Sequence, residues 1–104
     1  MGQPFEVHVD ADGFPSRVTV SGDLDLDGGD VLEGAVAPLL SPGSRVEIDL
    51  RQVDFLDSSG LAALVSLSQL AEEAPAYLVL LEPSARVRHV MEITSTESLF
   101  SFAA

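Results

Sequence analysis

The sequence predicts a single α/β domain in which helices flank a mixed sheet of four or five strands. Strand-like and helix-like segments alternate along most of the chain, which implies crossover connections and a partly parallel sheet. The first two strand-like segments instead follow each other across a short turn, which adds an antiparallel pair. The 104 residues contain no linker-like tract, so we expect one domain over residues 1–104, with a core from about residue 5 to residue 102.

The first two strands are predicted to pair as a hairpin. Residues 5–10 and 17–22 each alternate apolar and polar side chains, as half-buried strands do. Residues 11–15 between them contain Gly and Pro and are typical of a turn. The strands of the hairpin therefore account for the antiparallel part of the sheet.

The first helix is predicted from Val31 to Leu40, where apolar residues recur with helical spacing. An acidic connection precedes it, so Asp27 or Asp30 is expected to cap its N-terminus. Pro38 is expected to shorten its last turn, because proline removes a helical hydrogen bond.

Two further strands and a long helix follow. Residues 45–50 form a strand with β-branched side chains, and residues 59–73 form a helix that is apolar nearly all round and so is expected to be largely buried. Residues 76–81 are almost continuously apolar, which is typical of a strand covered on both faces.

A third helix is predicted after Ser84, which is expected to cap it. Residues 99–102 form either a last short strand or a packed tail. The expected inner face of the helix is apolar and consists of Val87, Val90, Met91 and Ile93.

The composition removes several classes of function. The chain has no Cys and no Lys, and its five cationic side chains are all arginines. It therefore has no thiolate nucleophile, Schiff-base lysine or P-loop, and no cofactor is predicted. A net charge of −12 repels nucleic acid and anionic membranes and favours a basic protein partner. We expect a cytoplasmic protein without membrane insertion, because neither a signal peptide nor a spanning apolar run is present.

Two other groups of residues, the acidic run and the two histidines, do not match the pattern of a metal site. The acidic run from Asp23 to Gly28 resembles the start of a calcium loop, but Gly34 stands where such a loop needs a bidentate Glu. His8 and His89 have no partner at helical metal-binding spacing. No metal site is predicted, although a relay from a histidine to a serine remains open, since triads ignore sequence order.

The turn Asp57-Ser58-Ser59-Gly60 is the most informative segment. A strand-like run ends in it and a helix begins, so Ser58 lies at or beside a helix N-terminus. Unpaired N–H groups and the helix dipole favour negative charge there. From the residues alone, Ser58 is a cap, a nucleophile or a phosphate acceptor, and Asp57 is expected to order the loop.

Three motifs in the same order give the chain a resemblance to the STAS domain, specifically to a stand-alone anti-sigma factor antagonist. Residues 22–25 (GDLD) resemble the family's G-E-L-D motif. Residues 48–61 resemble its central strand and phosphorylation loop, and residues 84–94 its last helix. The resemblance extends over nearly the whole chain.

The resemblance implies a phosphorylation switch. Ser58, which directly follows the Asp of the D-S-x-G turn, would accept a phosphate from a serine kinase that is also an anti-sigma factor. The unphosphorylated antagonist binds that kinase and frees the sigma factor, and a phosphatase reverses the modification. The protein would be non-enzymatic. Its partner-binding residues would be Asp23, Asp25, Asp57, Ser58, Ser59 and Gly60.

Departures from the family and two alternative functions complete the prediction. Asp23 stands in place of the usual Glu, Ser95 stands where the family often has Gly, and Gly28-Gly29 is expected to loosen the start of the first helix.

One alternative is a regulatory subunit of a lipid transporter or larger signalling assembly. The other is a small hydrolase that uses Ser58 with a histidine.

Overall fold

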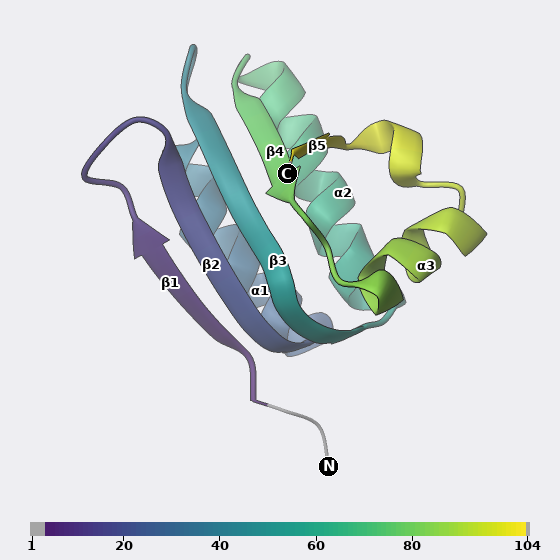
Figure 1. Cartoon of the computed structure of the whole chain (residues 1–104). Coiled ribbons are helices and arrows are strands. Elements are labelled where there is room, and N and C mark those ends of the chain that lie inside the picture. The colour runs from purple at the N-terminus through teal and green to yellow at the C-terminus, as the bar shows by residue number, and fades with distance from the viewer. Residues whose placement is uncertain (1–3, 104) are drawn as a thin grey trace.

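A computed structural model describes residues 4–103, so the predicted domain ends at Met1 and Ala104 lie outside the described residues. Figure 1 shows strands and helices that alternate after an initial hairpin. In chain order the elements are β1 (Glu6–Asp10), β2 (Ser16–Leu24), α1 (Leu26–Val36), β3 (Arg45–Leu56), α2 (Ser58–Glu73), β4 (Tyr77–Leu81), α3 (Ala85–Ile93) and β5 (Ser101–Ala103). Short 3-10 helices, Ala37–Leu39 and Glu97–Leu99, follow α1 and α3.

The sheet has the predicted mixed character. Its five strands lie in the order β1-β2-β3-β4-β5, with β1 antiparallel to β2 and every later pair parallel. Each parallel pair is joined by a helix, and successive right-handed crossovers in one direction bring helices to one face. Figure 1 shows α1 and α2 behind the sheet, whose other face is turned toward the viewer. Within residues 4–103, no helix is long and apolar enough to cross a membrane.

The hydrophobic core lies between the sheet and the helices. β2 contributes Val18, Val20 and Leu24 on alternate positions, as a strand with one buried face requires. The largest fully buried side chains elsewhere are Leu32, Ile48, Leu50, Leu64, Leu67, Leu80 and Met91. Burial of such a set stabilises the fold by about 1.5–3 kcal/mol for each large side chain.

Helix α1 begins earlier than predicted. It starts at Leu26, and its N-cap is Asp25 rather than Asp27 or Asp30, because the Asp25 carboxylate accepts a hydrogen bond from the Gly28 N–H. The end is as expected, since regular helix stops at Val36 and a 3-10 turn containing Pro38 follows. The acidic connection is therefore much shorter than its sequence suggested.

One prediction of burial is confirmed in part and another is wrong. Leu61, Ala63, Leu64, Leu67 and Ala71 of α2 are buried, whereas Ala62 and Leu70 are exposed. Ile93 does not join the inner face of α3, because it stands at the last helical position and is 68% exposed. Val87 and Met91 are fully buried, and Ser84 caps the helix as predicted.

The two strand predictions near the C-terminus also change. Tyr77 at the start of β4 is exposed, so only the second part of this strand is covered on both faces. The tail forms the short strand β5, which begins two residues later than the predicted segment.

The open face of the sheet carries paired charges. Glu47 on β3 is only 8% exposed and lies between two arginines, Arg17 at 2.9 Å and Arg45 at 3.2 Å. Asp49, two residues along, accepts hydrogen bonds from both the backbone and the side chain of Arg51. Hydrogen bonding by Arg17 lowers the pKa of Glu47, and hydrogen bonding by Arg51 lowers the pKa of Asp49. These carboxylates therefore stay ionised in the fold.

Candidate functional site

Two helix N-termini with the same local structure lie side by side at one end of the sheet. The Asp57 carboxylate accepts a hydrogen bond from the Gly60 N–H at 2.9 Å, as Asp25 does from Gly28 at 3.0 Å. Both helices thus begin with an Asp-x-x-Gly cap. The preceding strand ends, Leu24 and Leu56, are parallel neighbours in the sheet, which places the two caps next to each other.

Glycines allow these two helix starts to approach closely. A β-carbon on Gly60 would overlap the carbonyl oxygen of Leu24 and come within 2.8 Å of its carbonyl carbon. A β-carbon on Gly29 would lie 3.0 Å from the Ala63 side chain and 3.5 Å from the Ser59 carbonyl oxygen. Gly29 is therefore a packing residue, and both glycines of the Gly28-Gly29 pair are buried within the first turn of α1.

Ser58 is an exposed residue of this arrangement. It is the first residue of α2, directly after the Asp57 cap, and Ser59 beside it is half-buried. The first N–H groups of a helix lack partners within the helix, so the backbone around Ser58 favours an anion. Asp57 already supplies a carboxylate to one of these groups, the N–H of Gly60. A phosphate on Ser58 would meet both a favourable helix end and an adjacent negative charge.

Exposed apolar side chains lie at the same end of the sheet as Ser58 and the acidic residues. Leu26, which holds the same position in α1 as Ser58 does in α2, is 62% exposed, and Phe55 is 50% exposed. Phe55 pairs in register with Asp23 of β2. Exposed large apolar residues near acidic ones are typical of a protein–protein interface. The sequence did not single out Leu26 or Phe55.

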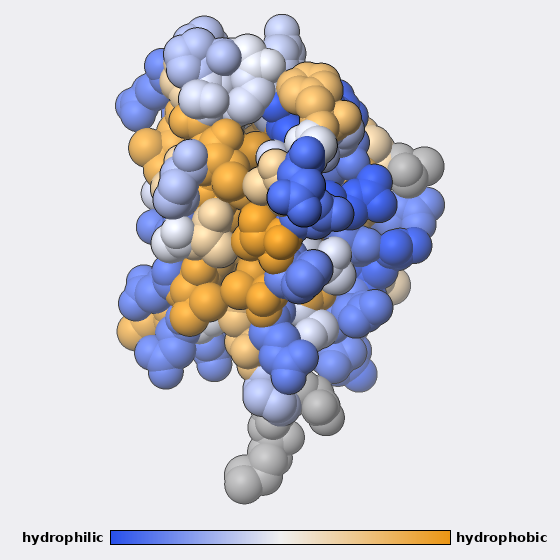
Figure 2. Space-filling model, turned by 90° about the vertical axis from the view of Figure 1, so that its left-hand side faces the viewer, coloured by the Kyte–Doolittle hydropathy of each residue, from blue (hydrophilic) through white to orange (hydrophobic). Residues whose placement is uncertain are grey.

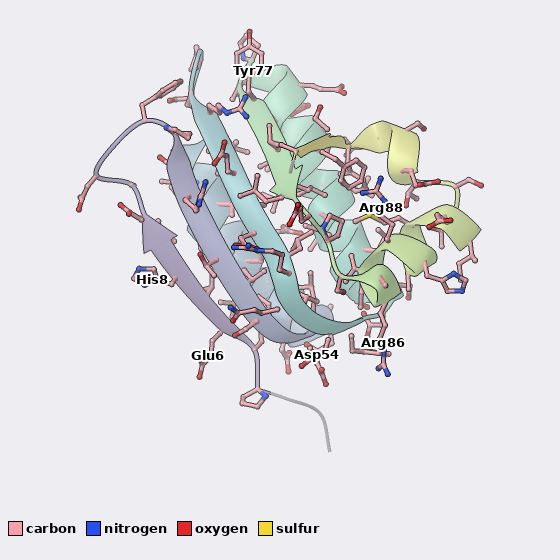
Figure 3. The ribbon with its side chains drawn as sticks, viewed as in Figure 1. Glu6, His8, Asp54, Tyr77, Arg86 and Arg88 are labelled. Atoms are coloured by element: carbon pink, nitrogen blue, oxygen red, sulfur yellow. The ribbon has the colours of Figure 1, made fainter. Side chains whose placement is uncertain are left out.

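Arg86 lies near the end of β3. Figure 3 shows Asp54 on β3 and Arg86 on α3 near each other, and both line one shallow hollow between the end of β3 and the start of α3. Arg88, one turn away from the α3 N-terminus, instead lies 4.5 Å from the centre of the Phe102 ring. The end of β3 thus has Asp54 beside Arg86 in one hollow and beside Arg51 in another.

Among the described residues, the geometry supports neither a histidine–serine relay at Ser58 nor a calcium site in the acidic run from Asp23 to Gly28. No hydrogen bond links His8 or His89 to Ser58 among residues 4–103, and Figure 3 places His8 on the outer strand β1. The searched residues contain no group of three or more acidic or histidine side chains able to hold a metal ion. Asp25, in the run that resembles a calcium loop, is used as a helix cap.

The predicted site residues divide into surface and support. Ser58 is exposed, while Asp23, Asp25, Asp57 and Ser59 are half-buried at the same end of the sheet. Gly60 is buried and lies beneath this surface against Leu24. We call the set Leu26, Phe55, Asp57 and Ser58 the Ser58 surface.

The fold and the site define a class of protein: a small α/β domain with helices on one face of a mixed sheet and a serine exposed at a helix start. Residues 7–100 match the family model described as "Mlab, STAS domain", and the chain belongs to the STAS domain family.

Similar proteins share one description. The chain is 26% identical over 88 residues to the anti-sigma-B factor antagonist of Bacillus subtilis (strain 168), covering 85% of this chain and 81% of that protein. It is 30% identical over 84 residues to the anti-sigma-B factor antagonist of Staphylococcus aureus (strain NCTC 8325 / PS 47), covering 80% and 78%. The crystal structure of an anti-sigma factor antagonist from Mycobacterium paratuberculosis superposes with a TM-score of 0.79 and 25% identity, covering 95% of this chain and 85% of that one.

Proposed function

We propose that this chain is an anti-sigma factor antagonist that acts as one STAS domain and is switched by phosphorylation of Ser58. In this function the unphosphorylated Ser58 surface binds an anti-sigma factor serine kinase, and the sigma factor is released. The main support for this function is the exposed Ser58 in a D-S-x-G turn at the start of α2. Relatives from two genera that bear the name anti-sigma-B factor antagonist support the same function.

Phosphorylation would act on the interface and leave the fold in place. The kinase transfers the γ-phosphoryl group of ATP to the Ser58 hydroxyl oxygen and releases ADP. The product adds a charge of about −1.5 to −2 at pH 7, and the α2 N-terminus offsets part of it by about 0.3–2 kcal/mol. Asp57 beside it, and Asp23 and Asp25 on the neighbouring strand end and cap, oppose it by repulsion.

Phosphorylation is expected to act mainly by weakening the binding of the partner protein. An apolar interface over Leu26 and Phe55 would have to accept both the charge and the bulk of a phosphate. A loss of about 3 kcal/mol at the interface weakens binding more than about a hundredfold. A separate phosphatase restores the binding form. The domain needs no cofactor and no catalytic activity of its own for this cycle, which we place in the cytoplasm.

Phosphorylation of the purified protein tests the site. Incubation with a co-encoded anti-sigma kinase and ATP should add one phosphate, read by intact mass. Ser58→Ala should abolish the modification, and Ser59→Ala, next to it and half-buried, should retain it. Loss of the phosphate in Ser59→Ala alone would move the site. A wild-type protein that stays unmodified with every such kinase of its organism would overturn the switch.

Binding of the unphosphorylated partner tests the interface. Ser58→Asp should remain folded and bind the kinase at least about tenfold more weakly, because a carboxylate adds charge to a desolvated contact. Ser98→Asp, at an exposed position of the Glu97–Leu99 turn, is the matched control and should bind like wild type. Equal affinity of the two variants would contradict the charge mechanism.

If the chain were instead a regulatory subunit of a transporter or of a larger signalling assembly, it would bind a different partner protein. Affinity purification from the native organism should recover a kinase-like anti-sigma factor. Recovery of membrane transport components, with no anti-sigma factor, would replace the proposed function by the alternative.

A further inference from the structure

The outer strand β1 leaves one edge of the sheet open. β1 pairs only with β2 among the described strands, so its other side has unpaired backbone N–H and C=O groups. Such an edge is a template for another strand unless the protein protects it. Proline, lysine and bulges are common protections, and residues Glu6–Asp10 contain none of these. The two acidic residues of β1, Glu6 and Asp10, are its only charged protection.

An apolar strip accompanies this edge on the helix side. Val7 and Val9 stand opposite Val20 and Val18, which are fully buried, so their side chains point to the core face of the sheet. Val9 nevertheless remains 37% exposed, because the sheet ends there. Figure 2, which looks onto this side of the molecule, shows a continuous hydrophobic area beside a strongly hydrophilic one.

Helix α1 continues the strip. Val31 is 50% exposed and lines a hollow together with Phe5, the residue before β1. Asp25 and Asp27 stand on the rim of the same hollow. Phe5 and Val31 therefore share their hollow with carboxylates.

The other face of β1 is acidic. Glu6, His8 and Asp10 stand opposite Ser21, Thr19 and Arg17, on the open face of the sheet. Figure 3 shows Glu6 and His8 along this outer strand. Arg17 stands opposite Asp10 but donates its hydrogen bond to Glu47, and the ion pairs found among the described residues do not include Arg17 with Asp10. A strand added to this edge would have its apolar side chains on the strip and its opposite side chains next to Glu6 and Asp10.

The acidic residues of β1 determine which kind of strand can pair with its free edge. If two copies paired antiparallel through β1 about His8, Glu6 of each copy would face Asp10 of the other, and like charges directly opposite destabilise a sheet. Two molecules of net charge −12 also repel each other at long range. Pairing with a second copy is therefore disfavoured. A basic strand is instead attracted both by Glu6 and Asp10 beside it and by the net negative charge of the molecule.

We propose that the free edge of β1 is a second docking site, which accepts an extended basic segment of a partner protein as an added strand. The segment alternates apolar residues, which cover Val9 and Val31, with arginine or lysine residues beside Glu6 and Asp10. Backbone pairing supplies affinity, and the alternating side chains supply specificity. The site lies on β1, away from the first turn of α2, and it does not depend on the function proposed for Ser58.

A short end-blocked peptide of alternating lysine and valine is a suitable probe. Titration into the ¹⁵N-labelled protein should give saturable chemical-shift changes in residues 5–10 and at Val31, with slowed exchange of β1 amides. A peptide with glutamate in place of lysine should bind at least about tenfold more weakly. A lysine–valine peptide N-methylated at alternate residues should also lose binding, because it cannot form the backbone ladder.

Two double variants with the same change of net charge separate local recognition from bulk attraction. Glu6→Lys with Asp10→Lys should weaken the peptide at least about tenfold, because it reverses the charge beside the added strand. Glu72→Lys with Glu73→Lys, at the exposed end of α2, should change the affinity by less than about twofold. Equal loss in both variants, or shifts confined to Asp23–Asp27, would overturn the proposal. Ser58→Ala should bind the peptide like wild type, so the outcome is independent of the proposed switch.

Discussion

Gly60 shows how a single residue without a side chain positions the site. Its Cα lies against the carbonyl group of Leu24, the last residue of β2, and Asp57 donates its N–H to the same oxygen at 3.3 Å. The two contacts hold the start of α2 against the end of the neighbouring strand. The exposure of Ser58, two residues before Gly60, depends on this fit.

Gly60→Ala is expected to lower the free energy of unfolding by about 2–4 kcal/mol, because the added methyl group meets backbone that cannot move aside. Urea denaturation followed by circular dichroism measures the change. Gly34→Ala is the matched control, since nothing lies within 4 Å of a β-carbon there and the position is inside α1. That variant should gain up to about 1 kcal/mol from helix propensity. Similar destabilisation of both variants would contradict the packing role of Gly60.

Glu47 gives the fold a defined pH dependence. Hydrogen bonding by Arg17 lowers the pKa of Glu47 from its ordinary value of 4.5, so this carboxylate binds protons less readily in the folded protein than in the unfolded chain. Its stabilisation is therefore fully present above pH 4.5 and is lost as the pH falls through the lower pKa of the folded state.

Glu47→Gln should lower the free energy of unfolding at pH 7 by about 1–2 kcal/mol, because the two arginines then face a neutral amide oxygen in place of a carboxylate and the attraction between opposite charges is lost. The difference from wild type should shrink below pH 4.5, where the wild-type carboxyl is itself neutralised. Urea denaturation of both proteins at several pH values checks this. Glu73→Gln on the exposed end of α2 should show little effect at any of them, and a difference that is constant with pH would contradict the assignment.

At the scale of elements, α3 ends in a well-formed Schellman motif with an unusual residue at its turn. The N–H of Ser95 donates to the Glu92 carbonyl at 3.1 Å, and the N–H of Thr96 to the Met91 carbonyl at 3.0 Å. Ser95 has φ = 57°, in the left-handed region that favours glycine. The resemblance to the family already pointed to this position, and the backbone gives the physical reason.

Ser95→Gly is expected to raise the free energy of unfolding by about 0.5–1 kcal/mol, because glycine adopts this conformation without a steric penalty. Thermal and urea unfolding measure the gain. Ser98→Gly, in the 3-10 turn where no positive φ is found, should instead destabilise by a similar amount or less. A loss of stability in Ser95→Gly would show that its side chain contributes more than its backbone strain removes.

The elements also show where prediction from sequence succeeds. Alternation and helical periodicity predict β1 to β4 and the three α-helices, because the core face of each element repeats with the period of that element, whereas they leave the segment that forms β5 open between a strand and a packed tail. The start of α1 was missed because Asp23–Gly28 alternates acids in the manner of a solvated loop, although Asp25-x-x-Gly28 matches the cap at Asp57. Leu26, Phe55 and Ile93 were not recognised as exposed, since an apolar side chain in isolation predicts burial. Their exposure follows from tertiary position, which a single sequence does not contain.

At the scale of the whole molecule, charge is distributed unevenly. The three ion pairs found among the described residues all lie on the open face of the sheet and use Arg17, Arg45 and Arg51. The chain has 17 acidic residues for five arginines, so much of the remaining surface is unneutralised. A net charge far from zero favours solubility, but it also opposes compaction by self-repulsion.

Salt should therefore stabilise the fold of this protein. An increase from about 20 mM to about 500 mM NaCl shortens the Debye length from about 20 Å to about 4 Å and screens the repulsion among exposed carboxylates. The ion pairs of the sheet face are weakened as well, but they are few and their carboxylates are largely buried. We expect a gain of about 1 kcal/mol, or about 5 °C in Tm, by thermal unfolding at pH 7.

The same buffers should have the opposite effect on partner binding. An acidic domain that attracts a basic partner loses long-range attraction as salt rises, so the affinity for the kinase and for the lysine–valine peptide should fall over the range in which Tm rises. Sucrose, which stabilises compact states without screening charge, is the control and should raise Tm without the loss of affinity. A Tm that falls with NaCl would mean that the arginine pairs outweigh the net charge of −12. An affinity that is independent of salt would mean that both proposed docking surfaces act through apolar contact alone.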